Sequence, residues 1–187
     1  MRFAAVLAST LLLTTVGCAV STDFEEEQAS ARSDLVGGGD YSACSLRRSS
    51  ILASTSPARQ RAIRRGFSWL DTNVQYSQSA SHQGYRTDCS GFVSMCWELG
   101  SSPNTAAFMA GNGKATALAS YDELLPGDAF IRSGHAALFL GWEDEAHTSA
   151  CIIELASTAS DMKFRSRTTS ALRGAGTKAF RADDLTG

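Results

Sequence analysis

Apolar residues at helical spacing mark where the folded part of the chain begins. Ile63, Phe67 and Leu70 recur at intervals of four and three residues, which gives residues 57–71 one apolar face. The serine and proline at positions 56 and 57 suit an N-cap and a first helical position. The pattern therefore predicts an amphipathic helix. Its other face, which we interpret as solvated, carries four arginines: Arg59, Arg61, Arg64 and Arg65.

A second helix is predicted over residues 88–99. Asp88 is a favoured N-cap residue, and Gly100 is a favoured residue just past a helix end. Four apolar side chains share one face of this segment: Cys89, Phe92, Val93 and Cys96. The residues that follow, 101–122, are rich in Ser, Gly, Asn and Ala, and we expect them to form a long loop.

Strand patterns fill the second half of the chain. Runs of β-forming residues predict strands at 128–132, 135–142, 150–156 and 178–182. The segment 143–149 is short enough to join two of these strands as an antiparallel hairpin. Because helices come first and strands follow, the sequence predicts an α+β domain over residues 57–187, with helices packed on an antiparallel sheet.

The N-terminus has the pattern of an export signal. Arg2 precedes a short apolar run at residues 4–13, which predicts a signal peptide over residues 1–18. The sequence Thr-Val-Gly-Cys that ends at Cys18 is similar to the lipobox of bacterial lipoproteins, in which the Cys thiol becomes lipidated. Ordinary cleavage after Ala19 is the alternative, and the sequence leaves both open.

Residues 19–56 are predicted to form a flexible tether. Acidic residues cluster between positions 23 and 34, three glycines follow at 37–39, and Ser and Thr are frequent. Such a composition buries too little apolar surface to offset the entropy lost on ordering. A tether of this kind suits a protein that is anchored at one end and must reach a substrate.

Composition narrows the classes of function. The chain of 187 residues has 17 Lys and Arg against 19 Asp and Glu, so no basic surface points to nucleic acid. Three His leave little room for a zinc site built from several histidines. Five Cys are too few for a disulfide scaffold, but in an oxidising envelope two of Cys44, Cys96 and Cys151 could pair, and the sequence does not say which.

Cys89 is the strongest candidate for chemistry. If Asp88 caps the helix, Cys89 lies in its first turn, where the helix dipole and free N–H groups stabilise a thiolate. We expect Gly91 to keep the approach to the sulfur open. Of the three histidines, His135 fits best as a partner because it opens an apolar strand, whereas His82 and His147 lie in polar loops. Taken singly, Cys89 could equally be an inert core residue.

Three motifs in order resemble one enzyme family. Asp-Cys-Ser-Gly-Phe-Val at 88–93, Leu-Pro-Gly-Asp at 125–128 and Gly-His-Ala-Ala-Leu-Phe-Leu-Gly at 134–141 are similar to motifs of the NlpC/P60 cell-wall cysteine peptidases, which belong to the papain-like superfamily. The resemblance covers roughly residues 66–182 and implies a papain-like fold. It makes Cys89 the nucleophile and His135 the base.

The same resemblance implies a substrate and its contacts. It places Tyr76 in the catalytic cleft and makes Tyr76, Asp88 and Ser90 the expected substrate-binding residues. The substrate would be the stem peptide of peptidoglycan, which agrees with export to the cell envelope, where that polymer lies. No metal, cofactor or nucleic acid is implied, and we expect a monomer, attached to the membrane if Cys18 is lipidated.

The third catalytic residue departs from the family pattern. Leu155 stands where the family usually has a polar residue ahead of Ala-Ser, so we turn to its neighbour Glu154. Residues opposite each other in a hairpin share a face, and faces alternate along a strand. Registers that set Glu154 opposite residue 135 or 137 would turn its carboxylate towards His135, as in the related CHAP amidases. Ser157 is the rival for this role.

Other functions would use the same residues. A CHAP-like amidase would cut a different bond, and a papain-like acyltransferase would exclude water as the acceptor. A non-catalytic envelope lipoprotein could keep the fold and only bind peptide. Because both Cys89 and His135 are present, we expect an exported hydrolase that acts through a thioester.

Overall fold

A computed structural model describes residues 41–111 and 114–185. Its centre is a seven-stranded antiparallel sheet in the order β1-β8-β7-β6-β5-β9-β4. The strands are β1 (Tyr41–Ser42), β4 (Ala115–Ala117), β5 (Ala129–Arg132), β6 (His135–Trp142), β7 (Ser149–Leu155), β8 (Met162–Thr168) and β9 (Lys178–Ala182). The helices are α2 (Arg48–Ala53), α3 (Pro57–Asp71), α4 (Cys89–Cys96), α5 (Thr105–Met109) and α6 (Thr169–Gly174), with a 3-10 turn, η2 (Tyr121–Glu123), and a small hairpin of β2 (Ser81–His82) and β3 (Tyr85–Arg86).

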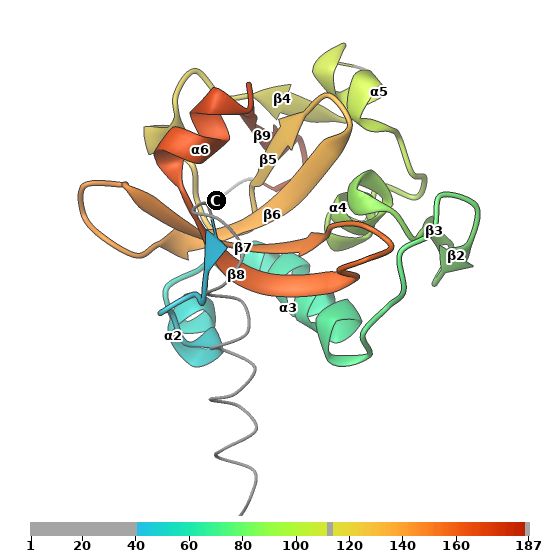
Figure 1. Ribbon diagram of the computed structural model, residues 1–187, viewed down its shortest axis with the longest axis horizontal. Coiled ribbons are helices and arrows are strands. Elements are labelled where there is room, and N and C mark those ends of the chain that lie inside the picture. The colour runs from blue at the N-terminus through green and yellow to red at the C-terminus, as the bar shows by residue number, and fades with distance from the viewer. Residues whose placement is uncertain (1–40, 112–113, 186–187) are drawn as a thin grey trace, which may run out of the picture.

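The two faces of the sheet are covered differently, as Figure 1 allows the reader to follow. Helices α3 and α4 pack on one face, over the alternate residues Ala136, Leu138 and Leu140 of β6. Helix α6 and η2 contribute to a smaller cluster on the other face, with Ala137 and Phe139. The α+β architecture with an antiparallel sheet that the sequence predicts is therefore confirmed.

Helix α3 has the predicted bounds, but its arginine face is not uniformly solvated. Arg61 and Arg64 are exposed, as expected. Arg59 is 3 % exposed and pairs with the buried Asp128 at 2.9 Å. Arg65 donates to the carbonyl of Cys96 at 2.9 Å and so covers the end of α4. The interpretation of a solvated face is wrong for these two residues, because α3 packs against both the end of α4 and the turn before β5.

Helix α4 ends before the predicted residue 99. Its C-cap is Trp97, and Glu98 takes the left-handed conformation with φ 53°. The N–H of Leu99 then bonds back to the carbonyl of Ser94 at 3.1 Å, which closes the helix. Gly100 is therefore not the residue that ends the helix, although it also has a positive φ of 70°.

The folded domain begins earlier than the tether prediction allows. Cys44 forms a disulfide with Cys151 on β7, with a Cα–Cα distance of 5.4 Å, and this selects one of the pairings that the sequence left open. Strand β1 pairs with β8, and Ile51 of α2 is buried in the main core. Residues 41–56 are thus part of the domain. The predicted signal peptide, Cys18 and the rest of the tether lie outside the described residues.

A segment predicted as a loop and a segment for which no element was predicted both contain regular structure. The expected loop at 101–122 holds α5, β4 and η2. Strand β8 was also missed, because charged residues at 163, 165 and 167 alternate with Met162, Phe164 and Ser166, which turn towards the main core. Within the described residues, no helix is both long and apolar enough to span a bilayer.

Candidate active site

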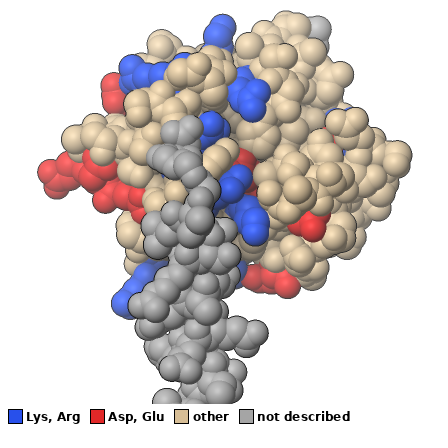
Figure 2. Space-filling model, in the orientation of Figure 1, with Lys and Arg blue, Asp and Glu red and all other residues tan. Residues whose placement is uncertain are grey.

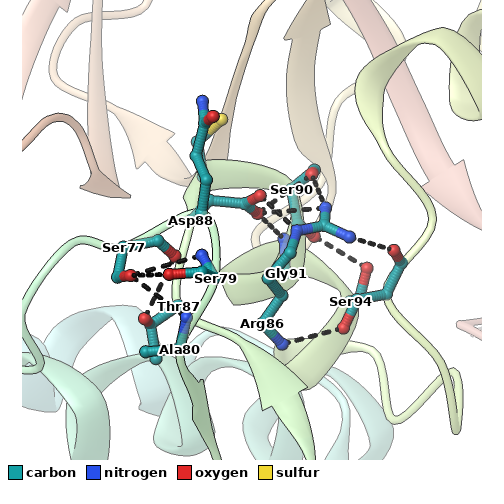
Figure 3. Close-up of polar contacts among 12 residues, drawn as sticks. Ser77, Ser79, Ala80, Arg86, Thr87, Asp88, Ser90, Gly91 and Ser94 are labelled. Atoms are coloured by element: carbon teal, nitrogen blue, oxygen red, sulfur yellow. Dashed lines mark hydrogen bonds and ion pairs between the residues drawn. The ribbon is translucent and has the colours of Figure 1, made fainter.

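A polar network fixes the start of α4. Asp88 is the N-cap residue, and its carboxylate accepts the N–H of Gly91 at 2.7 Å. Arg86 pairs with Asp88 and donates to the Ser90 hydroxyl at 2.9 Å, and this hydroxyl donates to Asp88 at 3.1 Å (Figure 3). Arg86 also bonds the carbonyl of Ser102 at 2.8 Å. The network sets the position of Cys89, the first residue of α4.

Gly91 has a packing role that was not predicted. A Cβ atom at this position would lie 1.9 Å from the carbonyl oxygen of Arg86, closer than any real contact. The glycine therefore allows β3 to pack against the first turn of α4. It brings the Arg86 backbone close to the helix, and an open approach to the sulfur stays a prediction.

Cys89 lies where α4 meets the start of β6. Its residue surface is 6 % exposed, and its Sγ is 3.9 Å from the carbonyl oxygen of Gly134 in the turn between β5 and β6. The N–H of Gly134 bonds the hydroxyl of Thr105 at 3.1 Å, so α5 supports this turn. The next residue is His135, whose side chain is 15 % exposed.

His135 connects the thiol to a carboxylate. Its Nε2 contacts Oε2 of Glu154, which leaves Nδ1 as the nitrogen for the Cys89 sulfur. Burial lowers the pKa of His135, but the hydrogen bonds and charges of Cys89 and Glu154 outweigh it and raise that pKa to about 9. The charged imidazolium is therefore the favoured form at neutral pH.

Glu154 faces His135 because of an irregularity in the hairpin. Near the turn, Gly141 pairs with Cys151, and continuing that register would turn Glu154 to the opposite face. A shift between residues 139 and 141 instead pairs Leu138 with Ile153, which sets Glu154 opposite Ala137. One of the two predicted registers is thus confirmed.

The Glu154 carboxylate is fully buried yet ionised. Its exposed fraction is 0 %, and Arg165 of β8 donates to its Oε1 at 2.6 Å. Burial acts to raise the pKa of Glu154, but His135 and Arg165 together hold that pKa below its usual value. A buried carboxylate that keeps its charge can in turn stabilise an imidazolium.

The other predicted site residues lie around this centre. Tyr76 is half-buried, with its N–H on the Asp161 carboxylate at 2.9 Å and its hydroxyl accepting from Gln78 at 3.3 Å. Asp88 and Ser90 are buried in the network that caps α4. The backbone carbonyl of Ser157 accepts two N–H bonds in the turn after β7. Substrate contact by Tyr76, Asp88 and Ser90 stays a prediction.

The other two histidines lie elsewhere. His147 contacts the carboxylate of Asp122 at 3.0 Å and stacks on Trp142. His82 packs edge-on against Trp69. Sequence reasoning missed Arg86 and Arg165, and only the two-residue alternation of β8 could have shown that Arg165 shares a face with Glu154.

The arrangement is suited to nucleophilic chemistry. A thiol at a helix start, an imidazolium beside it and a buried carboxylate behind it form a Cys–His–Glu series, in which each group orients the one before it. The described donors that lie close enough together for a metal ion include both Cys44 and Cys151, whose sulfurs are joined in the disulfide and are not free thiolates.

No protein-family model matches the chain, and no curated protein matches it at a significant level of similarity.

Proposed function

We propose that this protein is an exported cysteine hydrolase that cleaves an amide bond in peptidoglycan stem peptides. The observation that supports the proposal best is the contact series from Cys89 through His135 to the buried Glu154. The motif resemblance to the NlpC/P60 peptidases and their papain-like fold supports the choice of substrate. The predicted export signal would deliver the enzyme to the envelope, where peptidoglycan lies.

In the first half of the reaction, the Cys89 thiolate attacks the amide carbonyl carbon. The backbone N–H of Cys89, in the first turn of α4, is placed to donate to the oxyanion that forms. His135 then gives its proton to the leaving nitrogen as the C–N bond breaks. The products are a free amine and a thioester on Cys89.

In the second half, water replaces the amine. Neutral His135 takes a proton from water as its oxygen attacks the thioester carbonyl. The C–S bond breaks, a carboxylic acid leaves, and the thiolate and imidazolium are restored. Throughout both halves, Glu154 holds Nε2 of His135 and stabilises the imidazolium whenever it forms.

Digestion of purified sacculi tests the proposal. Wild-type protein should release peptide fragments whose new amine and carboxyl ends identify the scissile bond by mass spectrometry, and Cys89→Ala should release none. Cys96→Ala is the matched control, since Cys96 is the other free cysteine among the described residues and lies buried on the same helix. Equal release by wild type and Cys89→Ala would refute the proposal. Transfer of the peptide to an added amine would indicate an acyltransferase.

Attachment through Cys18 is a separate part of the proposal. If Cys18 is lipidated, the mature protein should partition into the detergent phase, and Cys18→Ser should move it to the aqueous phase. A soluble wild-type protein whose N-terminus follows Ala19 would support ordinary cleavage instead. Sequencing of the mature N-terminus separates the two outcomes.

A further inference from the structure

The active centre is surrounded by basic side chains from several strands. On β8, Lys163, Arg165 and Arg167 alternate onto the face that carries Glu154. Figure 2 shows Lys and Arg gathered over the part of the molecule where β8 runs in Figure 1. Besides β6 and β7, four elements carry the titratable and charged groups that face the His135–Glu154 pair: Cys89 (α4), Arg132 (β5), Lys163, Arg165 and Arg167 (β8) and Tyr41 (β1). Arg86 of β3 and Asp88, the N-cap residue of α4, lie beside Cys89.

Arg165 is the one of these basic residues that bonds the buried carboxylate. Its Nε donates to Oε1 of Glu154 at 2.6 Å, while His135 occupies Oε2. Each carboxylate oxygen is therefore bound by a different cation. His135 can lose its charge, and Arg165 cannot. When His135 is neutral during turnover, Arg165 alone keeps the Glu154 carboxylate ionised and in place.

The balance of charges in the site also indicates that it depends on Arg165. In the active state, Cys89 and Glu154 are anionic and His135 is cationic, so these three groups carry one net negative charge in a largely buried place. Arg165 brings the total to zero. Since a net charge is costly away from water, the thiolate depends on a second cation.

The ring of Tyr41 covers the guanidinium of Arg165 and holds it in this position. The guanidinium carbon of Arg165 lies 3.6 Å from the centroid of the Tyr41 ring, which covers it as a cation–π partner. Strand β1 pairs Tyr41 with Arg167, and the Cys44–Cys151 disulfide fixes this segment to β7. Tyr41, Arg165 and Glu154 therefore come from three neighbouring strands: β1, β8 and β7.

We propose that Arg165, covered by Tyr41, is a positioning residue that acts on His135 through Glu154. The proposal rests on the proposed function, because it assigns the work of Arg165 to the same thiol–imidazole pair. Arg165 does not contact the reacting atoms. It keeps Glu154 ionised and aimed at Nε2, and it offsets the negative charge of the thiolate.

The test follows His135 and Cys89 directly, without peptidoglycan. NMR of the full-length protein gives the titration midpoint of the His135 ring. Peptide-resolved mass spectrometry gives the iodoacetamide alkylation rate of Cys89 at mildly acidic pH, with Cys96 counted separately. Removing a cation favours protonated forms, so Arg165→Gln should raise the His135 midpoint by about one pH unit and slow Cys89 alkylation about tenfold.

Two further variants make these readouts specific. Glu154→Gln removes an anion and should shift the His135 midpoint in the opposite direction, to lower pH. Arg165→Lys keeps the positive charge and should restore both readouts towards wild type. Loss of packing alone would not give opposite shifts in Arg165→Gln and Glu154→Gln, nor recovery with lysine. Thermal melting checks the fold of each variant.

The outcomes separate this proposal from the proposed function. If wild-type Cys89 reacts no faster than Cys96, the thiol is not activated and the proposed function fails. If Cys89 is reactive but Arg165→Gln leaves both readouts unchanged, the role of Arg165 alone is overturned. If Arg165→Gln does not fold, Tyr41→Leu is the deciding variant, because it keeps the charge of Arg165 and removes the ring that covers it. A smaller shift of the His135 midpoint to higher pH would support the proposal. An unchanged midpoint would overturn it.

Discussion

In the part of the chain that the structure describes, the carboxylates of Asp128 and Glu154 are fully buried, and they are neutralised in different ways. Asp128, before β5, is held by Arg59 at 2.9 Å and Arg181 at 2.7 Å, and it also accepts the N–H of Leu125 at 2.8 Å. Glu154 has one arginine and one histidine. Both partners of Asp128 are permanently charged, whereas one partner of Glu154 can release a proton.

The comparison separates a structural ion cluster from a site that can do chemistry. The Asp128 cluster joins α3, β9 and the turn at residues 125–128, and Arg59 also binds the carbonyl of Leu185 at 3.1 Å. No proton needs to move there for the cluster to persist. Around Glu154, the protonation state of the carboxylate depends on His135, and the protonation state of His135 depends on the Cys89 thiol. Asp128 and Glu154 are equally buried, so what distinguishes Glu154 is the combination of burial with a titratable partner.

The largest effect should come from the group that moves the proton. His135→Ala removes general acid and base catalysis and should reduce turnover by about a hundredfold to ten-thousandfold. The assay is peptide release from sacculi at neutral pH. His147→Ala, at the exposed pair with Asp122, is the matched control and should leave turnover unchanged. A similar loss in both variants would contradict the assignment of His135.

Asp128→Asn should instead affect stability. Removing the carboxylate that Arg59 and Arg181 share breaks a buried ion cluster, and we expect a loss of about 3–5 kcal/mol in the free energy of unfolding. Urea unfolding measures the change. Asp122→Asn removes an exposed carboxylate and should leave the free energy of unfolding nearly unchanged. If Asp128→Asn left stability unchanged but abolished activity, the two carboxylates would not differ in the way described.

Glu154→Gln should lower turnover by about one to two orders of magnitude. The amide keeps an acceptor but loses a charge-assisted bond of roughly 1.5–3 kcal/mol. Its effect on stability should be smaller than that of Asp128→Asn, because the Arg165 side chain is 21 % exposed and can reach water. Ser157→Ala, at the rival position, should retain activity. Full activity in Glu154→Gln with loss in Ser157→Ala would reverse the assignment.

The last prediction concerns how stability depends on pH. Because the pKa of His135 rises on folding from 6.5 to about 9, its stabilising contribution is complete below pH 6.5 and is lost as pH rises through 9. The lowered pKa of Glu154 adds stability that is lost in acid. Urea unfolding at several pH values should show wild type and His135→Ala converging above pH 9. A constant difference between them would contradict the raised pKa of His135.

The parts predicted well from the sequence are those governed by local periodicity. The bounds of α3, β6 and β9 follow from residue spacing alone, and so does the N-cap at Asp88. The face of Glu154 was predictable only as one of two alternatives, because no pattern in the sequence marks the register shift between Phe139 and Gly141. The register shift decides which way Glu154 points: one residue of slippage would have turned it towards helices α3 and α4.

Long-range partners were outside the reach of sequence reasoning. Arg59 and Asp128 are separated by 69 residues, and Cys44 and Cys151 by 107. Nothing local distinguishes Arg59 from its exposed neighbours Arg61 and Arg64, because only the fold brings Asp128 to it. The same holds for residues 41–56, whose polar composition resembles a linker, although one buried Ile51 and one disulfide attach them to the domain.

The disulfide also determines how the domain would bear a mechanical load. A pull applied on the N-terminal side of Tyr41 reaches Cys44 after the short strand β1 and passes through the bridge into β7, in the middle of the sheet. Helices α3 and α4 lie between the bridged cysteines in the chain and are therefore off the path of force. Tension would be carried by β7, the strand that contains Glu154, while the helix that begins at Cys89 would remain unloaded.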